Sequence, residues 1–261
     1  MTRDIIRTER IGPVTVIHLQ DDRALNALGS ALVAGLADAL EHAQQDPEVR
    51  AVVITGSDRA FCAGAHIPEV LALREALTAG PDAEVYLDRL FDLLAASPQP
   101  VIAAVRGLAL GGGCELALAC DLVVAGESAS FGLPEVRLGV IPGAGGTQRL
   151  VHAIGKAKAT RMLMTGESVD AAWAESAGLV AEVAADEDVV ARAVDIARRA
   201  ADNAPSAVRL AVGCTRRAQD LSLTDGLAHE RRAFLEALAS DDAAEGMSAF
   251  AQKRRPVFGS R

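Results

Sequence analysis

Short runs of β-branched residues alternate with longer helical patterns along most of this chain, and this alternation limits the fold more than any other feature. The runs that predict strands are residues 14–19, 49–55, 101–105 and 122–125. Residues 30–44 predict a helix with Ser30 as its N-cap. Strands separated by helices pair in parallel, because a parallel crossover needs a long connection. The sequence therefore predicts an α/β core.

The pattern changes after about residue 186, where strand signal fades and Ala-rich helical patterns take over. Those patterns are broken at residues 203–205, 221–222 and 240–241. We therefore expect a core of residues 1–195 and a C-terminal helical region of residues 196–261, which packs on the core or on another subunit. Within the core, residues 69–96 predict two helices joined by a turn at Gly80 and Pro81.

The charge balance excludes several classes of function. The 261 residues carry 26 basic and 35 acidic side chains, a formal net charge of −9, which opposes binding of nucleic acid through its phosphates. Aromatic residues make up only 3% of the chain, so a stacking platform for single strands is not expected either. No uncharged stretch reaches the ~18 residues of a membrane helix, and the charged N-terminus lacks the apolar region of a secretory signal. The sequence predicts a cytoplasmic protein with no membrane or nucleic acid partner.

Familiar cofactor and metal motifs are absent from the sequence. It contains no GxGxxG, Walker A, HExxH or GxSxG pattern. The cysteines form no CxxC pair, and no His cluster stands at metal-ligand spacing. Disulfides are rare in the cytosol, so we predict reduced, structural thiols at Cys62, Cys114, Cys120 and Cys214. No metal site is predicted.

Three Gly-rich segments follow or adjoin predicted strands, which is where α/β proteins place their sites. They are residues 55–65, 107–121 and 131–148. In the second segment, three consecutive glycines at 111–113 precede a run of helix formers, which puts them at a helix N-terminus. Unpaired N–H groups at such a terminus favour an anion. A plain tight turn between strand and helix is an equally good interpretation of this segment alone.

Two acidic residues lie in apolar stretches of these segments. Glu115 falls in the first turn of the predicted helix, where a carboxylate is costly to desolvate and needs a partner or a function. A simple capping or salt-bridging role is the alternative. Glu135 follows Pro134, and by itself it is typical of a solvated loop carboxylate. Two carboxylates in one apolar pocket would suit general acid–base chemistry, and the residues alone leave open whether these two meet.

Six segments together resemble the enoyl-CoA hydratase/isomerase (crotonase) superfamily. They are ALNAL at 24–28, AFCAGAHI at 60–67, PVIAAVRGLALGGGCELALACD at 100–121, FGLPEVRLGVIPGAGGTQRL at 131–150, GKAKA at 155–159 and EGMSAFAQKR at 245–254. The similarity runs from about residue 11 to the C-terminus without large gaps. It implies a crotonase (ClpP-like) α/β spiral of ββα units with a C-terminal helical region. That region would pack subunits into a trimer or a dimer of trimers and complete the CoA site.

The resemblance implies an acyl-CoA thioester as the substrate and gives roles to four residues. The backbone N–H groups of Ala65 and Gly112 would form an oxyanion hole, in which each donor is typically worth ~2.7–4 kcal/mol in the transition state. Glu115 would orient and deprotonate water for attack at C3, and Glu135 would deliver a proton to C2. The expected reaction is reversible hydration of 2-trans-enoyl-CoA to 3-hydroxyacyl-CoA, in fatty-acid or related acyl-CoA metabolism, without a metal or redox cofactor.

Further contacts with the substrate are implied at positions that match the family's motifs. Residues 23–25 would run along the nucleotide, and a basic residue near the C-terminus would approach a phosphate. The full implied set is Arg23, Ala24, Leu25, Ala63, His66, Ile67 and Lys253. The chain has His66 and Pro68 where the family often has Asp and Lys, and Asp21 and Asp22 in place of Arg and Pro. We expect a structural role for His66.

Two other functions are compatible with the resemblance. A Δ3,Δ2-enoyl-CoA isomerase would need only Glu135, as a base that moves a proton between C2 and C4. A non-catalytic member would bind acyl-CoA, or RNA, without turnover. The presence of both glutamates favours a hydratase over the isomerase, and the acidic net charge opposes RNA binding.

Overall fold

The computed structural model describes residues 5–79 and 87–259, and its largest element is a six-stranded sheet. In spatial order the strands are β1 (Ile6–Ile11), β2 (Val14–Leu19), β3 (Ala51–Thr55), β5 (Val101–Val105), β7 (Leu122–Gly126) and β10 (Glu182–Ala184). β1 and β2 form an antiparallel hairpin, and all other neighbours pair in parallel. The predicted strands and their parallel pairing are confirmed.

Three-residue strands form a second, smaller sheet. In spatial order they are β4 (Ala60–Cys62), β6 (Leu108–Leu110), β8 (Ser130–Gly132) and β9 (Ser168–Asp170). β4, β6 and β8 are parallel, and each follows a strand of the large sheet, namely β3, β5 and β7. Because parallel strands end at the same edge of a sheet, the segments that follow β4, β6 and β8 are brought together. Those segments contain Ala65, Gly112 and Glu135.

Eleven α-helices and two 3₁₀ helices complete the described part of the chain. The α-helices are α1 (Ser30–Gln45), α2 (Ile67–Ala79), α3 (Asp88–Ala95), α4 (Gly112–Ala119), α5 (Gly146–Ile154), α6 (Lys156–Thr165), α7 (Ala171–Ala177), α8 (Val189–Ala201), α9 (Pro205–Arg217), α10 (Leu223–Leu238) and α11 (Asp241–Ala251). The 3₁₀ helices are η1 (Pro134–Leu138) and η2 (Asp186–Asp188). The predicted helices on either side of Gly80 and Pro81 are α2 and α3, and the turn itself lies outside the described residues.

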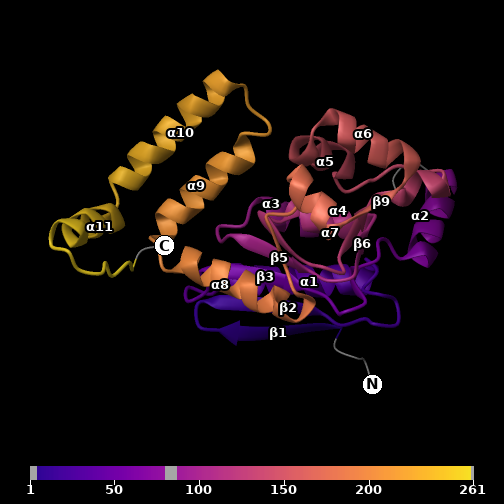
Figure 1. Cartoon of the computed structure of the whole chain (residues 1–261), viewed down its shortest axis with the longest axis horizontal. Helices are drawn as coiled ribbons and strands as arrows, with labels where there is room; N and C mark the ends of the chain where they lie inside the picture. The colour runs from indigo at the N-terminus through magenta and orange to yellow at the C-terminus, as the bar shows by residue number, and fades with distance from the viewer. Residues whose placement is uncertain (1–4, 80–86, 260–261) are drawn as a thin grey trace.

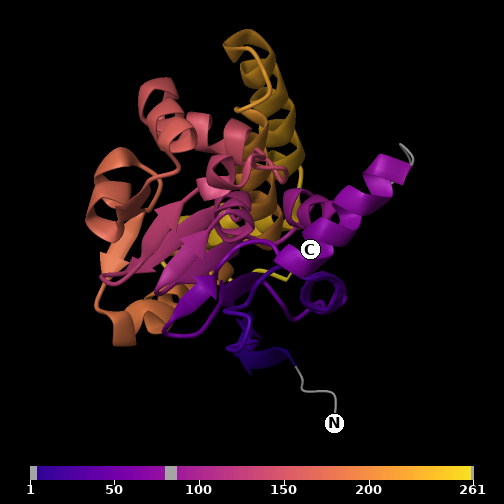
Figure 2. The same cartoon turned by 90° about the vertical axis from the view of Figure 1, so that its right-hand side faces the viewer.

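Both faces of the large sheet are buried, which explains the continuous apolar runs of its strands. Along β2, Val14 and Val16 pack on one face against α8, while Ile17 and Leu19 pack on the other face with α1. Figure 2 shows the sheet between these helical layers. Burial also raises the pKa of the Cys62 thiol to about 12, and all four cysteines are unpaired, as predicted.

The start of α1 differs from the prediction. Its N-cap is Gly29, and Ser30 is the first helical residue. Glycine has no side chain that could accept an N–H of the first turn. Instead the carboxylate of Glu69 accepts the Ser30 N–H at 2.7 Å. The Ser cap was wrong because a carboxylate from a distant helix supplies the acceptor that a serine normally provides.

The last three α-helices form an arm beside the core. In Figure 1, α10 lies along α9, and α11 lies at the far end of the arm. α8 belongs to the core, because its buried side chains pack on the sheet as far as Ala197; the boundary expected between residues 195 and 196 thus lies within α8. Arg216 anchors α9 to the core: its guanidinium pairs with both Asp121 oxygens at 2.7 and 2.8 Å.

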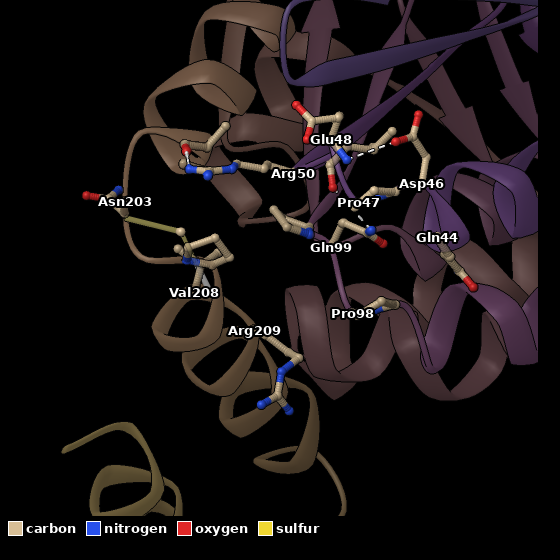
Figure 3. Close-up of a pocket in the computed structure, with 16 residues that line it drawn as sticks. Gln44, Asp46, Pro47, Glu48, Arg50, Pro98, Gln99, Asn203, Val208 and Arg209 are labelled. Carbon is tan, nitrogen blue, oxygen red and sulfur yellow. Dashed lines mark hydrogen bonds between the residues drawn. The ribbon is translucent and has the colours of Figure 1, made fainter. Parts of the chain in front are cut away.

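A cavity of about 250 Å³ lies where the arm leaves the core. Figure 3 shows Gln99 and Arg50 on its core side and Val208 and Arg209 on α9. Arg50 donates to the carbonyl oxygens of Ala201 and Phe258, at 3.2 and 3.0 Å. The cavity contains none of the predicted site residues. Among the described residues, no helix combines the length and the apolar character that a membrane span requires.

Candidate active site

The predicted helix N-terminus is the start of α4, and each glycine there has a steric reason. Gly111 has a φ of +52°, a conformation that favours glycine. A Cβ on Gly113 would stand 2.0 Å from the carbonyl oxygen of Cys62, so no side chain fits. A Cβ on Gly112 would stand 3.0 Å from a methyl group of Leu28. The main chain of α4 therefore packs directly on β4 and on the segment after it.

The amides of Ala65 and Gly112 are neighbours. A Cβ built on Gly112 would be only 3.7 Å from the Ala65 nitrogen. Within the described part of the chain, neither N–H donates to a protein oxygen. The dipole of α4 adds positive potential at Gly112. Two adjacent unpaired donors can bind an oxygen on which negative charge develops.

Glu115 lies in the first turn of α4 and is only 3% exposed. Its Oε1 atom accepts the N–H groups of Ala144 and Gly146, at 2.7 and 2.8 Å. Burial raises the pKa of this carboxyl, while the two amides and the positive charge of Arg149 act in the opposite direction. Glu115 is therefore a buried carboxyl whose Oε1 is held by two main-chain amides, and its Oε2 accepts neither of them.

Glu135 reaches the same place from η1. Its Oε1 would be 3.1 Å from a Cβ on Gly111, the residue that caps α4. Its Oε2 is buried and has no hydrogen-bond partner. Burial and, more weakly, the charge of Glu115 raise the pKa of Glu135. The structure therefore places the Glu135 carboxyl beside Gly111, at the N-terminus of α4, and near enough to Glu115 in the first turn of that helix for the two charges to interact.

The segment that contains Arg23, Ala24 and Leu25 lies against the strand that leads to Ala65. The Ala63 N–H donates to the Leu25 carbonyl at 3.0 Å. Three residues on, the Leu28 N–H donates to the Gly64 carbonyl at 2.7 Å. Arg23 is exposed on the turn. Leu25 and Ala63 are thus close to the Ala65 amide, and Arg23 and Ala24 precede Leu25 on the same turn.

His66 and Ile67 stand at the start of α2. His66 Nδ1 lies 3.2 Å from Glu69 Oε1, an ion-pair distance without hydrogen-bond alignment. The same carboxylate accepts the first N–H of α1, through its other oxygen. Ile67 is 48% exposed. Glu69 therefore connects α1 to the residue beside Ala65, a link that the sequence did not indicate.

Lys253 is the one predicted site residue that lies far from the others within a single chain. It follows α11, is exposed, and has a φ of +53°. Figure 1 shows α11 and α2 at opposite ends of the molecule. A single chain therefore does not bring Lys253 to the two glutamates. Within residues 5–79 and 87–259, no group of three or more His, Cys, Asp or Glu side chains is placed to hold a metal ion.

Comparison with known proteins gives one consistent family. The family model for enoyl-CoA hydratase/isomerase matches residues 9–261. A protein of Mycobacterium bovis named "Probable enoyl-CoA hydratase" is 45% identical over 263 residues, which cover 100% of both chains. The 2,3-dehydroadipyl-CoA hydratase of Escherichia coli is 44% identical over 248 residues, 95% of this chain and 96% of that one.

Solved structures agree with this result. The crystal structure of an enoyl-CoA hydratase from Bacillus anthracis superposes with a TM-score of 0.90 and 37% identity, and covers 98% of this chain and 100% of that one. The predicted crotonase-type fold is therefore confirmed. From the family match, the whole-length relatives and this superposition together, we conclude that the chain belongs to the enoyl-CoA hydratase/isomerase family of enzymes.

Proposed function

We propose that this enzyme hydrates 2-trans-enoyl-CoA to 3-hydroxyacyl-CoA, reversibly. The observation that carries the proposal is the meeting of two carboxyls and two unpaired amides at one helix terminus. The Glu135 carboxyl lies beside Gly111, in the glycine turn that presents the Gly112 amide near that of Ala65, and Glu115 follows in the first turn of α4. An enzyme that moves one proton between two carbons would need one carboxyl. Addition of water needs a base for the water and an acid for the carbon.

The four groups divide the reaction between them. Glu115 takes a proton from water as the water oxygen bonds to C3, and the electrons of the double bond move toward the thioester carbonyl. The amides of Ala65 and Gly112 stabilise the negative charge on that oxygen. Glu135 gives a proton to C2, and the carbonyl re-forms. No electron leaves the substrate, so the reaction needs no redox cofactor, and the amides take the place of a metal as the electrophile.

The environments of the two carboxyls suit these roles. Glu135 has a raised pKa and an Oε2 without a partner, which favours a protonated group that can donate to carbon. Burial raises the pKa of Glu115 as well, and the two amides and Arg149 oppose that rise by favouring the charged form that a base requires. Burial of Glu115 and of the Oε2 atom of Glu135 also limits their contact with the bulk water that would weaken each interaction.

The proposal assigns the remainder of the substrate to the neighbouring surface. The nucleotide part of CoA would lie along Arg23, Ala24 and Leu25. The pantetheine would pass Ala63 and His66 to reach the amides, and the acyl chain would extend past Ile67. The exposure of Ile67 on α2 supports an apolar contact there.

A homo-oligomer, either a trimer or a dimer of trimers, is part of the proposal. Leu223 and Phe250 on the arm are 79% and 87% exposed, and apolar surface of that kind marks an interface. In an oligomer, Lys253 of one subunit would reach the CoA phosphates bound by another. Light scattering should give three or six times the chain mass of 27.1 kDa. The mass of one chain would contradict this part of the proposal.

Two substrates test the proposed reaction. Incubation with crotonyl-CoA should give 3-hydroxybutyryl-CoA. The loss of the ultraviolet absorbance of the conjugated thioester measures this reaction. A 3-enoyl-CoA should be converted far more slowly. Rapid isomerisation of the 3-enoyl-CoA with little hydration would identify an isomerase instead. Binding of acyl-CoA without turnover of either substrate would identify a non-catalytic member.

A further inference from the structure

Asn26 is the most completely buried polar side chain among the described residues. Its exposure is 0%, and its backbone has a φ of +55°. Nδ2 donates to the carbonyl oxygens of Ala60 and Phe61, at 3.0 and 3.1 Å. Oδ1 accepts the N–H of Asp21 at 2.7 Å. The amide group is thus satisfied on both sides by main-chain atoms, as a buried amide must be.

These bonds join two segments that are distant in sequence. On one side is the turn of residues 21–26, which the Asn26 N–H closes by donating to the Asp21 carbonyl at 2.8 Å. On the other side is β4, and the chain leaves β4 to reach Ala65 three residues later. The partners of Asn26 lie 34 and 35 residues away from it in the chain.

The turn is held in a conformation that its residues do not favour by themselves. Leu25 precedes Asn26 with a φ of +51°. Asparagine adopts this region more readily than most residues, but leucine does so rarely. Such geometry persists only where the surroundings fix it. Here the fixing contacts are the Asn26 amide and the bond from Ala63 N–H to the Leu25 carbonyl.

We propose that Asn26 is a positioning residue that couples binding of the nucleotide end of CoA at residues 21–26 to the placement of the Ala65 amide. The coupling rests on the proposed function, because that function puts the nucleotide on this turn. Contacts far from the reacting carbons can raise kcat when their binding energy fixes groups at the reacting centre. The Asn26 amide is the side-chain link between this turn and β4, and it adds to the main-chain bond from Ala63 N–H to the Leu25 carbonyl.

A truncated substrate separates coupling from a purely structural role. Crotonyl-pantetheine has the thioester and lacks the nucleotide. For the wild-type enzyme we expect kcat with crotonyl-CoA to exceed kcat with crotonyl-pantetheine by about 10- to 100-fold. In Asn26→Gly, which keeps access to positive φ, this ratio should fall toward one, mainly through loss of kcat with crotonyl-CoA. Asn203→Gly, an exposed asparagine beyond α8, is the matched control and should keep the wild-type ratio.

Two outcomes would overturn the coupling. One is an equal loss with both substrates in Asn26→Gly, which is the pattern of a general structural defect. The other is a wild-type ratio near one. A wild-type enzyme that hydrates neither thioester would instead refute the proposed function. The two failures are therefore distinguishable.

A second measurement does not depend on turnover or on that variant's folding. Free CoA added to the wild-type protein should slow amide hydrogen exchange in residues 60–66 as well as in residues 21–26. The same experiment with Asn26→Asp, which keeps Oδ1 and loses the Nδ2 donors, should show protection in residues 21–26 only. Protection confined to the turn in the wild-type protein would contradict the coupling.

Discussion

The Oε1 atom of Glu115 accepts the backbone N–H of Gly146 at 2.8 Å, across 31 positions of the chain. A Cβ at residue 146 would stand 3.0 Å from both Cγ and Oε1 of Glu115. A side chain at residue 146 would therefore crowd the carboxylate where it approaches this amide, which opens α5. The helix N-terminus supplies a donor and a positive dipole end to the proposed base. The Gly-rich loop before α5 thus serves Glu115 rather than the substrate directly.

Replacement of Glu115 by Gln should reduce kcat by ~10²–10⁴, which is the usual contribution of a general base. Gln keeps an oxygen for the Ala144 and Gly146 donors, so the fold should persist. Hydration of crotonyl-CoA and the circular dichroism spectrum measure the two effects. Glu127→Gln, at an exposed glutamate, is the matched control. A turnover within a fewfold of wild type would remove Glu115 from the mechanism.

Arg149 should set the pH at which Glu115 acts. Its charge lowers the pKa of Glu115 against the effect of burial, and its guanidinium lies 3.4 Å from the Ala144 carbonyl. Arg149→Gln removes that charge, so the pKa of Glu115 rises further. The base is active when deprotonated, so the acid limb of the kcat/KM profile should move to higher pH.

Arg149→Lys is the matched comparison, because it retains the positive charge. Its acid limb should stay near that of the wild-type enzyme. If the profiles of Arg149→Gln and the wild-type enzyme coincide, Arg149 has no electrostatic role at Glu115 and serves the loop geometry alone.

The helices and strands that could be predicted from the sequence are those in which a hydrophobic pattern continues over five or more residues. β2 and β5 have the predicted bounds, and the helices after residue 186 break where Pro205, Ser222 and Ser240 stand. The strands of the small sheet are three residues long, too short for periodicity to emerge. Yet these strands bring Ala65, Gly112 and Glu135 together. Their meeting was expected only from the family resemblance.

Residues that act through distant contacts could not be recognised from the sequence. Asn26 lies in ALNAL, where a polar residue between apolar ones is typical of an ordinary turn or strand end. Its burial depends on β4, more than thirty residues away. Glu69 likewise caps α1 from α2. Only the residue type indicated that residue 26 has an unusual backbone conformation, because asparagine adopts positive φ more readily than most residues.

Glu135→Gln should separate activity from stability. Loss of the acid at C2 should reduce kcat by ~10²–10⁴. The raised pKa means that the folded protein holds this proton more tightly than the unfolded chain does. Ionisation of Glu135 therefore costs stability as the pH rises above the ordinary carboxyl value of about 4.3. The variant lacks this cost and should melt at a higher temperature than wild type at pH 8.

The same reasoning fixes the control for Glu135→Gln. Near pH 4 the carboxyl of the wild-type protein is mostly protonated in both states, so the difference in melting temperature should shrink. Calorimetry at the two pH values measures it. A melting temperature at pH 8 below that of wild type would mean that the ionised carboxyl contributes a favourable contact, and would contradict its role as a buried proton donor.

Adjacent glycines at the start of α4 should respond differently to alanine. At Gly112 the added Cβ meets only the flexible end of Leu28 at 3.0 Å, but it stands 3.7 Å from the Ala65 nitrogen, where the thioester oxygen would bind. At Gly113 it meets the fixed carbonyl of Cys62 at 2.0 Å. Gly112→Ala should therefore fold with a small loss of stability and lose ~10²-fold or more in kcat/KM, as when an oxyanion donor is displaced.

Gly113→Ala should lower the free energy of unfolding by about 1–3 kcal/mol or more. Denaturant titration and crotonyl-CoA kinetics on both variants distinguish these effects, and a kcat/KM of Gly112→Ala within a fewfold of wild type would contradict the assignment of Gly112 to the oxyanion site.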